Sequence, residues 1–239
     1  MHPHDTEEEI NQKLFEQAKN FARWQYLAIS KYVSGKVLEI GCGNGRITRQ
    51  LYANQQVTGI TGIDTNKEYL KNVKMIFRDW NAKPLTFAYL DISTNVPREF
   101  REMFDSVLSI NALEHIENDV GILQSCRLLL KPGGRIVLLV PALKILYGEP
   151  DRAQHHFRRF SRRELKVKLS LSGFTVEKLF PMNFFGTFAW FYHSRILKLR
   201  VHRAKDMFLF DRFVPLFRFM ETVAPIPFGL SYIAIGKKE

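Results

Sequence analysis

Short apolar runs alternate with amphipathic segments along most of the chain. Apolar runs of about 4–8 residues between glycines or acidic residues are typical of buried strands, and apolar residues three or four positions apart indicate helices. This pattern predicts strands at 36–40, 57–63, 85–90, 104–110, 135–140, 174–180 and 231–236, and helices at 46–53, after Asn66, at 118–130 and at 162–171. The alternation favours an α/β fold: a doubly wound, mostly parallel seven-stranded sheet with helices on both faces.

Two segments do not fit this alternation. Residues 7–32 carry apolar side chains at helical spacing, which predicts an amphipathic helix or helix pair. Residues 184–229 are rich in Phe, Arg and Lys and are too long for a simple connection. We therefore expect an N-terminal helical segment (1–34), a main domain (35–183 and 230–239) and an inserted helical lid or surface-binding subdomain (184–229).

Composition restricts the class of protein. Of 239 residues, 46% are apolar and 25% charged, as in ordinary globular proteins. The two cysteines, Cys42 and Cys126, form no paired motif, which favours a reduced intracellular protein, and we predict no metal site. The acidic N-terminus lacks the features of a secretory signal, and no apolar run could span a bilayer. We expect a cytoplasmic protein.

Positive charge gathers in the second half of the chain. Residues 144–218 hold 16 Lys and Arg against 6 Asp and Glu, which is nearly all of the net charge of +11. This asymmetry suggests an anionic partner, such as a phosphorylated substrate, the inner surface of a membrane or a nucleic acid. A solvated basic face is the alternative.

A glycine-rich turn follows the first predicted strand, with Gly41, Gly43 and Gly45 two residues apart and Glu39 before them. Such a turn lets backbone N–H groups approach a ligand closely. The dinucleotide-binding fingerprint would need glycine at position 46, which is Arg46. The spacing therefore argues against a dinucleotide site.

The turn resembles motif I of the class I S-adenosylmethionine-dependent methyltransferases, and later strand ends extend the resemblance over about residues 36–141. Asp64 matches the acidic residue that binds the ribose hydroxyls in this family, and Asp91 the residue that contacts the adenine. The resemblance implies a Rossmann-like methyltransferase fold with S-adenosylmethionine as cofactor. The implied cofactor-binding residues are Glu39, Gly41, Gly43, Gly45, Asp64, Asp91, Ile92 and Asn111.

The acceptor side carries weaker signals. The fourth strand is not followed by the Asn/Asp-Pro-Pro-Tyr sequence of base-amine methylation, and no Pro-Cys pair supplies a nucleophile. His115, after that strand, has a side chain that titrates near neutrality and is a candidate general base. Packing within the loop is the other interpretation of His115.

A second candidate patch covers residues 147–161 and resembles a segment of a bacterial subgroup of these enzymes. We predict His156 as a general base, and Tyr147, Arg158 and Arg159 as substrate-binding residues, the arginines because guanidinium binds carboxylate or phosphate bidentately. The alternative is a structural loop whose arginines form ion pairs with the body of the domain.

Taken together, these features predict an enzyme that transfers a methyl group to an O or N atom of a small-molecule, lipid or glycan-precursor acceptor. The aromatic and basic insertion could contact a membrane peripherally, or it could only pack onto the sheet. An RNA or protein methyltransferase that uses the basic half is a second hypothesis, and nucleic acid is less favoured because no RNA-binding module is present. A non-catalytic cofactor-binding scaffold is a third. Oligomeric state is left open.

Overall fold

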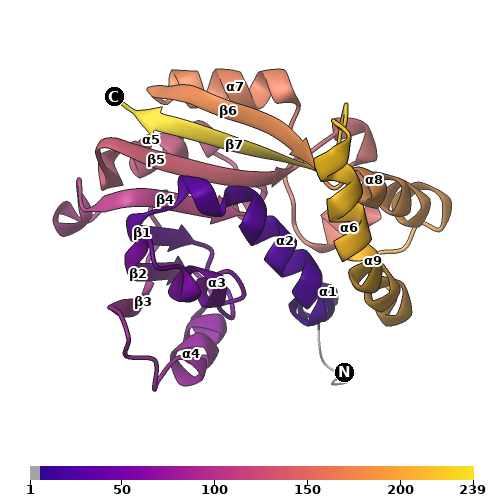
Figure 1. Cartoon of the computed structure of the whole chain (residues 1–239), viewed down its shortest axis with the longest axis horizontal. Helices are drawn as coiled ribbons and strands as arrows, with labels where there is room; N and C mark the ends of the chain where they lie inside the picture. The colour runs from indigo at the N-terminus through magenta and orange to yellow at the C-terminus, as the bar shows by residue number, and fades with distance from the viewer. Residues whose placement is uncertain (1–5) are drawn as a thin grey trace.

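The computed structural model describes residues 6–239, and a single seven-stranded sheet forms its centre (Figure 1). The strand order is β3-β2-β1-β4-β5-β7-β6, and β7 runs antiparallel to both of its neighbours. The strands are β1 (Gly35–Ile40), β2 (Val57–Asp64), β3 (Leu85–Tyr89), β4 (Phe104–Ile110), β5 (Leu130–Pro141), β6 (Phe174–Met182) and β7 (Ser231–Lys238). The sheet is thus mixed, with six strands parallel to one another, and the α/β class predicted from the alternation is confirmed.

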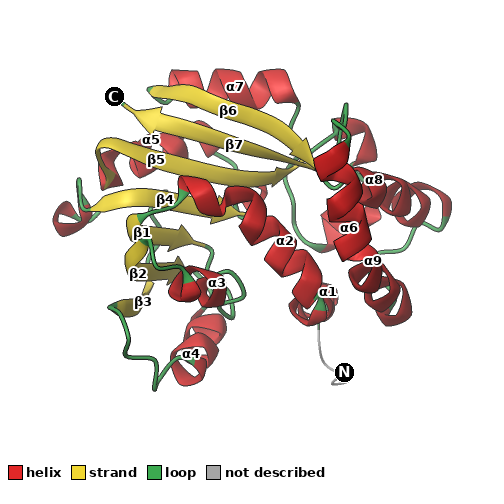
Figure 2. Cartoon of the chain, in the orientation of Figure 1, coloured by secondary structure: helices red, strands yellow, loops and turns green. Residues whose placement is uncertain are grey.

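Helices cover both faces of the sheet and one of its ends (Figure 2). They are α1 (Glu7–Gln17), α2 (Lys19–Ile29), α3 (Thr48–Ala53), α4 (Lys67–Ile76), α5 (Asp119–Leu129), α6 (Glu149–Ala153), α7 (Arg162–Leu171), α8 (Phe184–Phe191) and α9 (Ala204–Val223). Helices α5 and α7 pack on one face, with Leu123 and Leu165 in the same apolar core as Val107. Helices α2, α3 and α9 meet the other face around Leu108.

Local sequence explains where several helices begin. The Asn66 side chain accepts hydrogen bonds from the amides of Glu68 and Tyr69 and so caps α4 as predicted. Asn118 and Ser161 do the same for α5 and α7, each accepting from one amide of the first turn. These caps fix the point at which the chain leaves each strand-end loop, and the loops carry the candidate site.

The N-terminal segment forms a helix pair, one of the two forms predicted for it, because the backbone leaves helical geometry at Ala18 (ψ 71°). Residues 1–5 of that segment lie outside the described residues. Several boundaries differ from the prediction. Helix α3 begins at Thr48, since the glycine turn continues past position 46. Strand β5 begins at Leu130, not 135, because an irregularity between Phe104 and Ser106 of β4 lets residues before position 135 join the ladder.

The reversed strand β7 decides where the insertion lies. Met182, at the end of β6, pairs with Ser231, at the start of β7, and Ser231 also pairs with Pro141. The chain therefore leaves and re-enters the sheet at the carboxyl ends of the parallel strands. Helices α8 and α9 lie beyond that edge, on the right in Figure 1, and α9 packs against α1 and α2.

Candidate active site

One large cavity, of about 1100 Å³, opens at the carboxyl ends of the strands. Its walls come from the loops after β1, β2, β3 and β4, from α1 and α2, and from α8 and α9. A pocket for a single small ligand typically measures about 300–1,000 Å³. The cavity therefore has room for a cofactor and part of an acceptor, at the edge where ligands bind in open α/β sheets.

The glycine turn after β1 forms one end of the cavity. Gly41, Gly43 and Gly45 have positive φ angles of 70°, 51° and 80°, which side chains strongly disfavour. A Cβ atom on Gly41 would lie 2.9 Å from the Cβ of Ala112. Gly41 and Gly43 line the cavity, whereas Gly45 packs beneath the turn against Phe77. The backbone of the turn is thus exposed to a ligand without side chains in the way.

The acidic strand ends predicted to bind the cofactor meet around this turn. Asp64 accepts a hydrogen bond from the Gly43 amide (2.8 Å) and another from the Asn66 amide (2.8 Å). Asp91 accepts from the amide (2.9 Å) and hydroxyl (2.6 Å) of Ser93 through one oxygen. Both carboxylates line the cavity, as do Ile92 and Asn111, which has a positive φ of 51°.

Glu39 occupies the floor of the cavity and is buried, and the half-buried Arg46 lies close to it. Burial raises the pKa of Glu39 to about 8, although a hydrogen bond from the Thr48 hydroxyl (2.5 Å) and the charge of Arg46 oppose this shift. Burial also lowers the pKa of Arg46 to about 10. Sequence reasoning missed the roles of Arg46 and Thr48, because only the fold of the turn brings them to Glu39.

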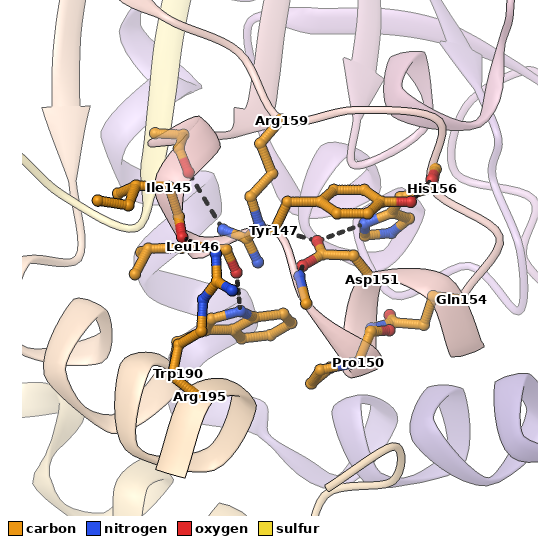
Figure 3. Close-up of polar contacts among 12 residues, drawn as sticks. Ile145, Leu146, Tyr147, Pro150, Asp151, Gln154, His156, Arg159, Trp190 and Arg195 are labelled. Carbon is orange, nitrogen blue, oxygen red and sulfur yellow. Dashed lines mark hydrogen bonds and ion pairs between the residues drawn. The ribbon is translucent and has the colours of Figure 1, made fainter. Parts of the chain in front are cut away.

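His156 and Arg159 share one buried carboxylate (Figure 3). The Asp151 carboxylate accepts from Arg159 Nε (2.8 Å) and from the Gly148 amide (2.9 Å), and it lies 3.0 Å from His156 Nδ1. Burial alone would raise the pKa of Asp151, but the hydrogen bond from His156 and the charge of Arg159 hold it below its ordinary value. The Arg159 guanidinium also stacks on the Trp190 ring, 4.3 Å from its centroid. His156 and Arg159 line the cavity.

The other two residues of the predicted substrate-binding set lie outside the cavity lining. Tyr147 donates its hydroxyl hydrogen bond to the backbone carbonyl of His156 (2.7 Å). Arg158 pairs with Asp119 (2.7 Å) and donates to the carbonyl of Glu117 (2.8 Å). For Arg158 this placement agrees with the alternative of an ion pair to the body of the domain, and it argues against direct contact with an acceptor.

His115 lies beside His156, with the two ring centroids 4.7 Å apart and the rings perpendicular. Desolvation of the His115 ring within the cavity wall, together with the neighbouring His156, lowers its pKa to about 3, although the residue as a whole is not buried. Glu114, the preceding residue, is buried, and burial raises the pKa of its carboxyl to about 7. Neither oxygen of Glu114 has a hydrogen-bond partner in any other described residue. The two histidines predicted as candidate bases thus form one cluster.

The insertion supplies the opposite wall. Trp190, His193, His202 and Asp206 face the cavity, and His193 Nε2 lies 3.4 Å from the Asp206 carboxylate. Burial lowers the pKa of His202 to about 4. One ring nitrogen of each of these histidines is buried without a hydrogen-bond partner among the described residues. Unpaired polar atoms at a cavity wall point to a ligand that satisfies them.

The residues present suit S-adenosylmethionine. The glycine turn leaves room for backbone approach, and the remaining acceptor capacity of Asp64 and Asp91 suits hydroxyl and amino donors. Glu39 provides an acidic group for the cationic methionine end. These assignments remain predictions of role.

Comparisons with known proteins agree with this geometry. A family model described as a methyltransferase domain matches residues 33–165. The ubiquinone biosynthesis O-methyltransferase of Vibrio vulnificus is 32% identical over 101 residues, which is 42% of this chain and 41% of that relative, so the chain matches less than half of the relative's length.

Solved structures extend the similarity to the whole fold. An S-adenosylmethionine-dependent methyltransferase from Mesorhizobium loti gives a TM-score of 0.62 at 14% identity, covering 90% of this chain and 98% of that one. The [4+2]-cyclase SpnF gives 0.63 at 15% identity, covering 99% and 98%. A cyclase on the same fold shows that the fold alone does not fix the reaction. The family model, however, covers more than half of the chain, and it shows that the protein belongs to the methyltransferase-domain family, whose cofactor is the S-adenosylmethionine predicted from the strand ends.

Proposed function

We propose that this protein transfers a methyl group from S-adenosylmethionine to a hydroxyl oxygen of a small or lipid-linked acceptor. The observation that carries the proposal is the continuity of one cavity from the glycine turn, at Gly43, to the Asp151–His156 pair and the insertion. Cofactor and acceptor can therefore lie end to end, which is the arrangement that an in-line displacement needs. The name of the Vibrio vulnificus relative supports oxygen as the target atom.

The chain's own residues supply alignment and a proton acceptor. When bound, the cofactor supplies the methyl group on a sulfonium that already carries the positive charge. A hydroxyl acceptor must lose its proton during the transfer, and a positioned base accelerates that loss. Asp151 holds the Nδ1 side of His156, which leaves Nε2 as the nitrogen available to an acceptor in the cavity.

In this proposal residues 184–229 form a lid. Trp190 packs on Arg159 and donates its indole hydrogen bond to the carbonyl of Leu146 (3.3 Å), so the insertion closes over the segment that carries His156. The α1–α2 pair covers the other side, where Glu16 accepts a hydrogen bond from Asn44 in the glycine turn. Both cover the cavity and exclude water from the reacting groups.

We also propose that the outer face of α9 contacts a membrane surface. Phe208, Leu209, Leu216, Phe219 and Val223 lie on this helix and are exposed, with Phe208 at 71% and Phe219 at 64%. Within residues 6–239, none of the helices combines the length and apolarity that a bilayer-spanning helix needs. An apolar face within the basic part of the chain suits anionic lipid, which attracts Lys and Arg electrostatically.

Flotation with phosphatidylcholine vesicles, with and without phosphatidylglycerol, tests the membrane contact. We expect the unmodified protein to float with the anionic vesicles and the F208S/F219S variant to remain in the bottom fraction. L171S removes a similarly exposed apolar side chain (67%) from α7 and is the matched control. Equal flotation of F208S/F219S and the unmodified chain would contradict the role of α9.

Labelled S-adenosylmethionine incubated with fractionated extracts of bacterial cells tests the methyl transfer. We expect label to enter a small or lipid-soluble product, and mass spectrometry of its fragments to place the methyl group on oxygen. H156Q should reduce turnover more than cofactor affinity. Label recovered in bulk RNA or in protein would support the second sequence hypothesis instead, and the absence of any product with bound cofactor would support the scaffold.

A further inference from the structure

A cluster of three metal-ligating side chains lies in the cavity wall. Glu114 and His115 belong to the turn after β4, and His156 to the loop after α6. One ligand atom from each residue lies within 4.8 Å of the other two. Among residues 6–239 this is the group of side chains whose identity and spacing suit a metal ion.

Glu114 is the residue of this cluster whose carboxylate lacks hydrogen bonds. Its side chain is 1% exposed, and both carboxylate oxygens lack a hydrogen-bond partner in any other described residue. A buried polar group without a partner is costly, and a buried charge more so, unless something in the site compensates it. The Glu114 carbonyl accepts from the Phe157 amide (2.9 Å), so the backbone holds this carboxylate beside His156.

His156 has the surroundings of a metal-ligating histidine. A metal-bound imidazole almost always gives its second N–H to a carboxylate or carbonyl, which fixes its orientation and raises its basicity. Asp151 fills that position at 3.0 Å from Nδ1, and Arg159 and the Gly148 amide hold Asp151 in turn. The nitrogen left for a ligand is Nε2. The perpendicular ring of His115 lies against this imidazole.

Against the prediction of no metal site made from the sequence, we propose that Glu114, His115 and His156 bind one divalent first-row transition-metal ion, with Zn²⁺ as the reference, and that its remaining coordination positions would be available to the acceptor. Two imidazoles and one carboxylate suit such an ion better than Mg²⁺ or Ca²⁺, which prefer oxygen ligands. Three protein ligands with one position open are typical of catalytic zinc. An ion with bonds of about 2.0–2.2 Å would draw these three atoms, which lie within 4.8 Å of one another, closer together.

The ion would narrow the acceptor class, and this part rests on the proposed function. With both carboxylates ionised, Arg159 and a divalent ion leave one net positive charge in the cluster. That charge suits an acceptor with an ionisable hydroxyl, such as a phenol or catechol, because a metal ion lowers the pKa of an oxygen acid that it binds. His156 would then be a ligand and no longer the proton acceptor. The ion would lower the pKa of the acceptor hydroxyl, and the hydroxyl proton would pass to water at the mouth of the cavity.

Metal binding is measured without cofactor or acceptor. The untagged full chain is treated with chelator and dialysed, and Zn²⁺ is added in a calorimeter, with the Co²⁺ absorption spectrum as a second reading. All proteins carry H2Q and H4Q, because the two N-terminal imidazoles could bind metal by themselves. We expect one Zn²⁺ per chain at micromolar concentration or below. E114Q, H115Q and H156Q should each weaken binding about 100-fold or more, and D151N by about 10–100-fold.

H202Q is the matched control, because His202 is a half-buried histidine of the same cavity whose Nε2 is buried and has no hydrogen-bond partner among the described residues. Its Zn²⁺ affinity should equal that of the parent. E114Q keeps the shape of the carboxylate and serves if a histidine variant fails to fold. The proposal is wrong if the parent binds no Zn²⁺ below about 1 mM, or if E114Q and H156Q bind it as the parent does. Because no methyl transfer is measured, failure of the proposed function would leave this result intact.

Discussion

The buried ion pair between Asp151 and Arg159 should contribute much more to stability than the ion pair formed by its chain neighbour Arg158. Both side chains of the first pair are essentially inaccessible, and Asp151 Oδ1 lies 2.8 Å from Arg159 Nε. Arg158 also lies 2.7 Å from a carboxylate, that of Asp119, but its own side chain is 24% exposed. Because the two ion pairs have similar distances but differ in burial, comparing the unfolding free energies of D151N and R158M shows the effect of burial.

The magnitudes follow from what each variant leaves behind. D151N removes the carboxylate that is hydrogen-bonded to the buried Arg159 guanidinium, which costs about 3–5 kcal/mol of unfolding free energy. In R158M, Asp119 keeps its ion pair with Lys168 (2.7 Å), so the unfolding free energy of this variant should fall by no more than about 0–1 kcal/mol. The double variant D151N/R159M should lose less than the sum of the single losses, by about 0.5–3 kcal/mol.

Urea unfolding followed by circular dichroism measures these values, with the folded baseline of each variant compared at pH 7. A D151N loss no larger than that of R158M would refute the reasoning. It would mean that the interaction between the Asp151 carboxylate and the buried Arg159 guanidinium adds nothing to the unfolding free energy. Strict additivity in the double variant would lead to the same conclusion.

Three further predictions concern the glycine turn, the Glu39 carboxyl at the floor of the cavity and the first residue of β1. G43V and D64A should abolish binding of S-adenosylmethionine and of its demethylated product in calorimetry while the fold survives. The turn needs a positive φ at Gly43, and Asp64 accepts a hydrogen bond from the Gly43 amide. Normal affinity in either variant would contradict the placement of the site. Burial raises the pKa of Glu39 from 4.5 to about 8, so stability should fall with rising pH between these values by at most about 1.4 kcal/mol per unit, and E39Q should remove that slope in urea unfolding. G35A should lose about 1–3 kcal/mol, because Gly35 has a φ of 70° and a Cβ there would collide with Asp105, yet keep cofactor affinity.

The gathering of the predicted cofactor-binding carboxylates around one cavity could be predicted from sequence because it depends on local signals, and their roles stay predictions. Asp64 and Asp91 each follow an apolar run, and Glu39 lies next to the last residue of one. The carboxyl ends of parallel strands meet at one edge of a sheet. Their proximity in the fold could therefore be inferred although they lie far apart in the sequence. The same logic places Asn111, which ends the fourth run and lines the cavity.

The acceptor half could not be predicted because it depends on long-range packing and on side-chain direction. Arg158 and Arg159 are neighbours of one type, and sequence treats them alike, yet one faces Asp119 and the other Asp151. Glu114 and His156 meet only because the segment after α6 folds back to the turn after β4. No periodicity reports such a contact.

The insertion has a polar face toward the cavity and an apolar face toward solvent. The reversed strand β7 holds the insertion over the carboxyl edge, so that His193 and His202 face the cavity while Phe208 and Phe219 of α9 face outward. If α9 lies on a membrane, a lipid-linked acceptor reaches the cavity from that surface. F208S/F219S should then raise the KM for an acceptor presented in vesicles and leave kcat unchanged. With a water-soluble acceptor lacking the lipid chain, KM should not change, because the cavity wall is intact. A rise in KM for both acceptors would mean that the substitutions distort the wall, and the outward face would then have no part in delivering the acceptor.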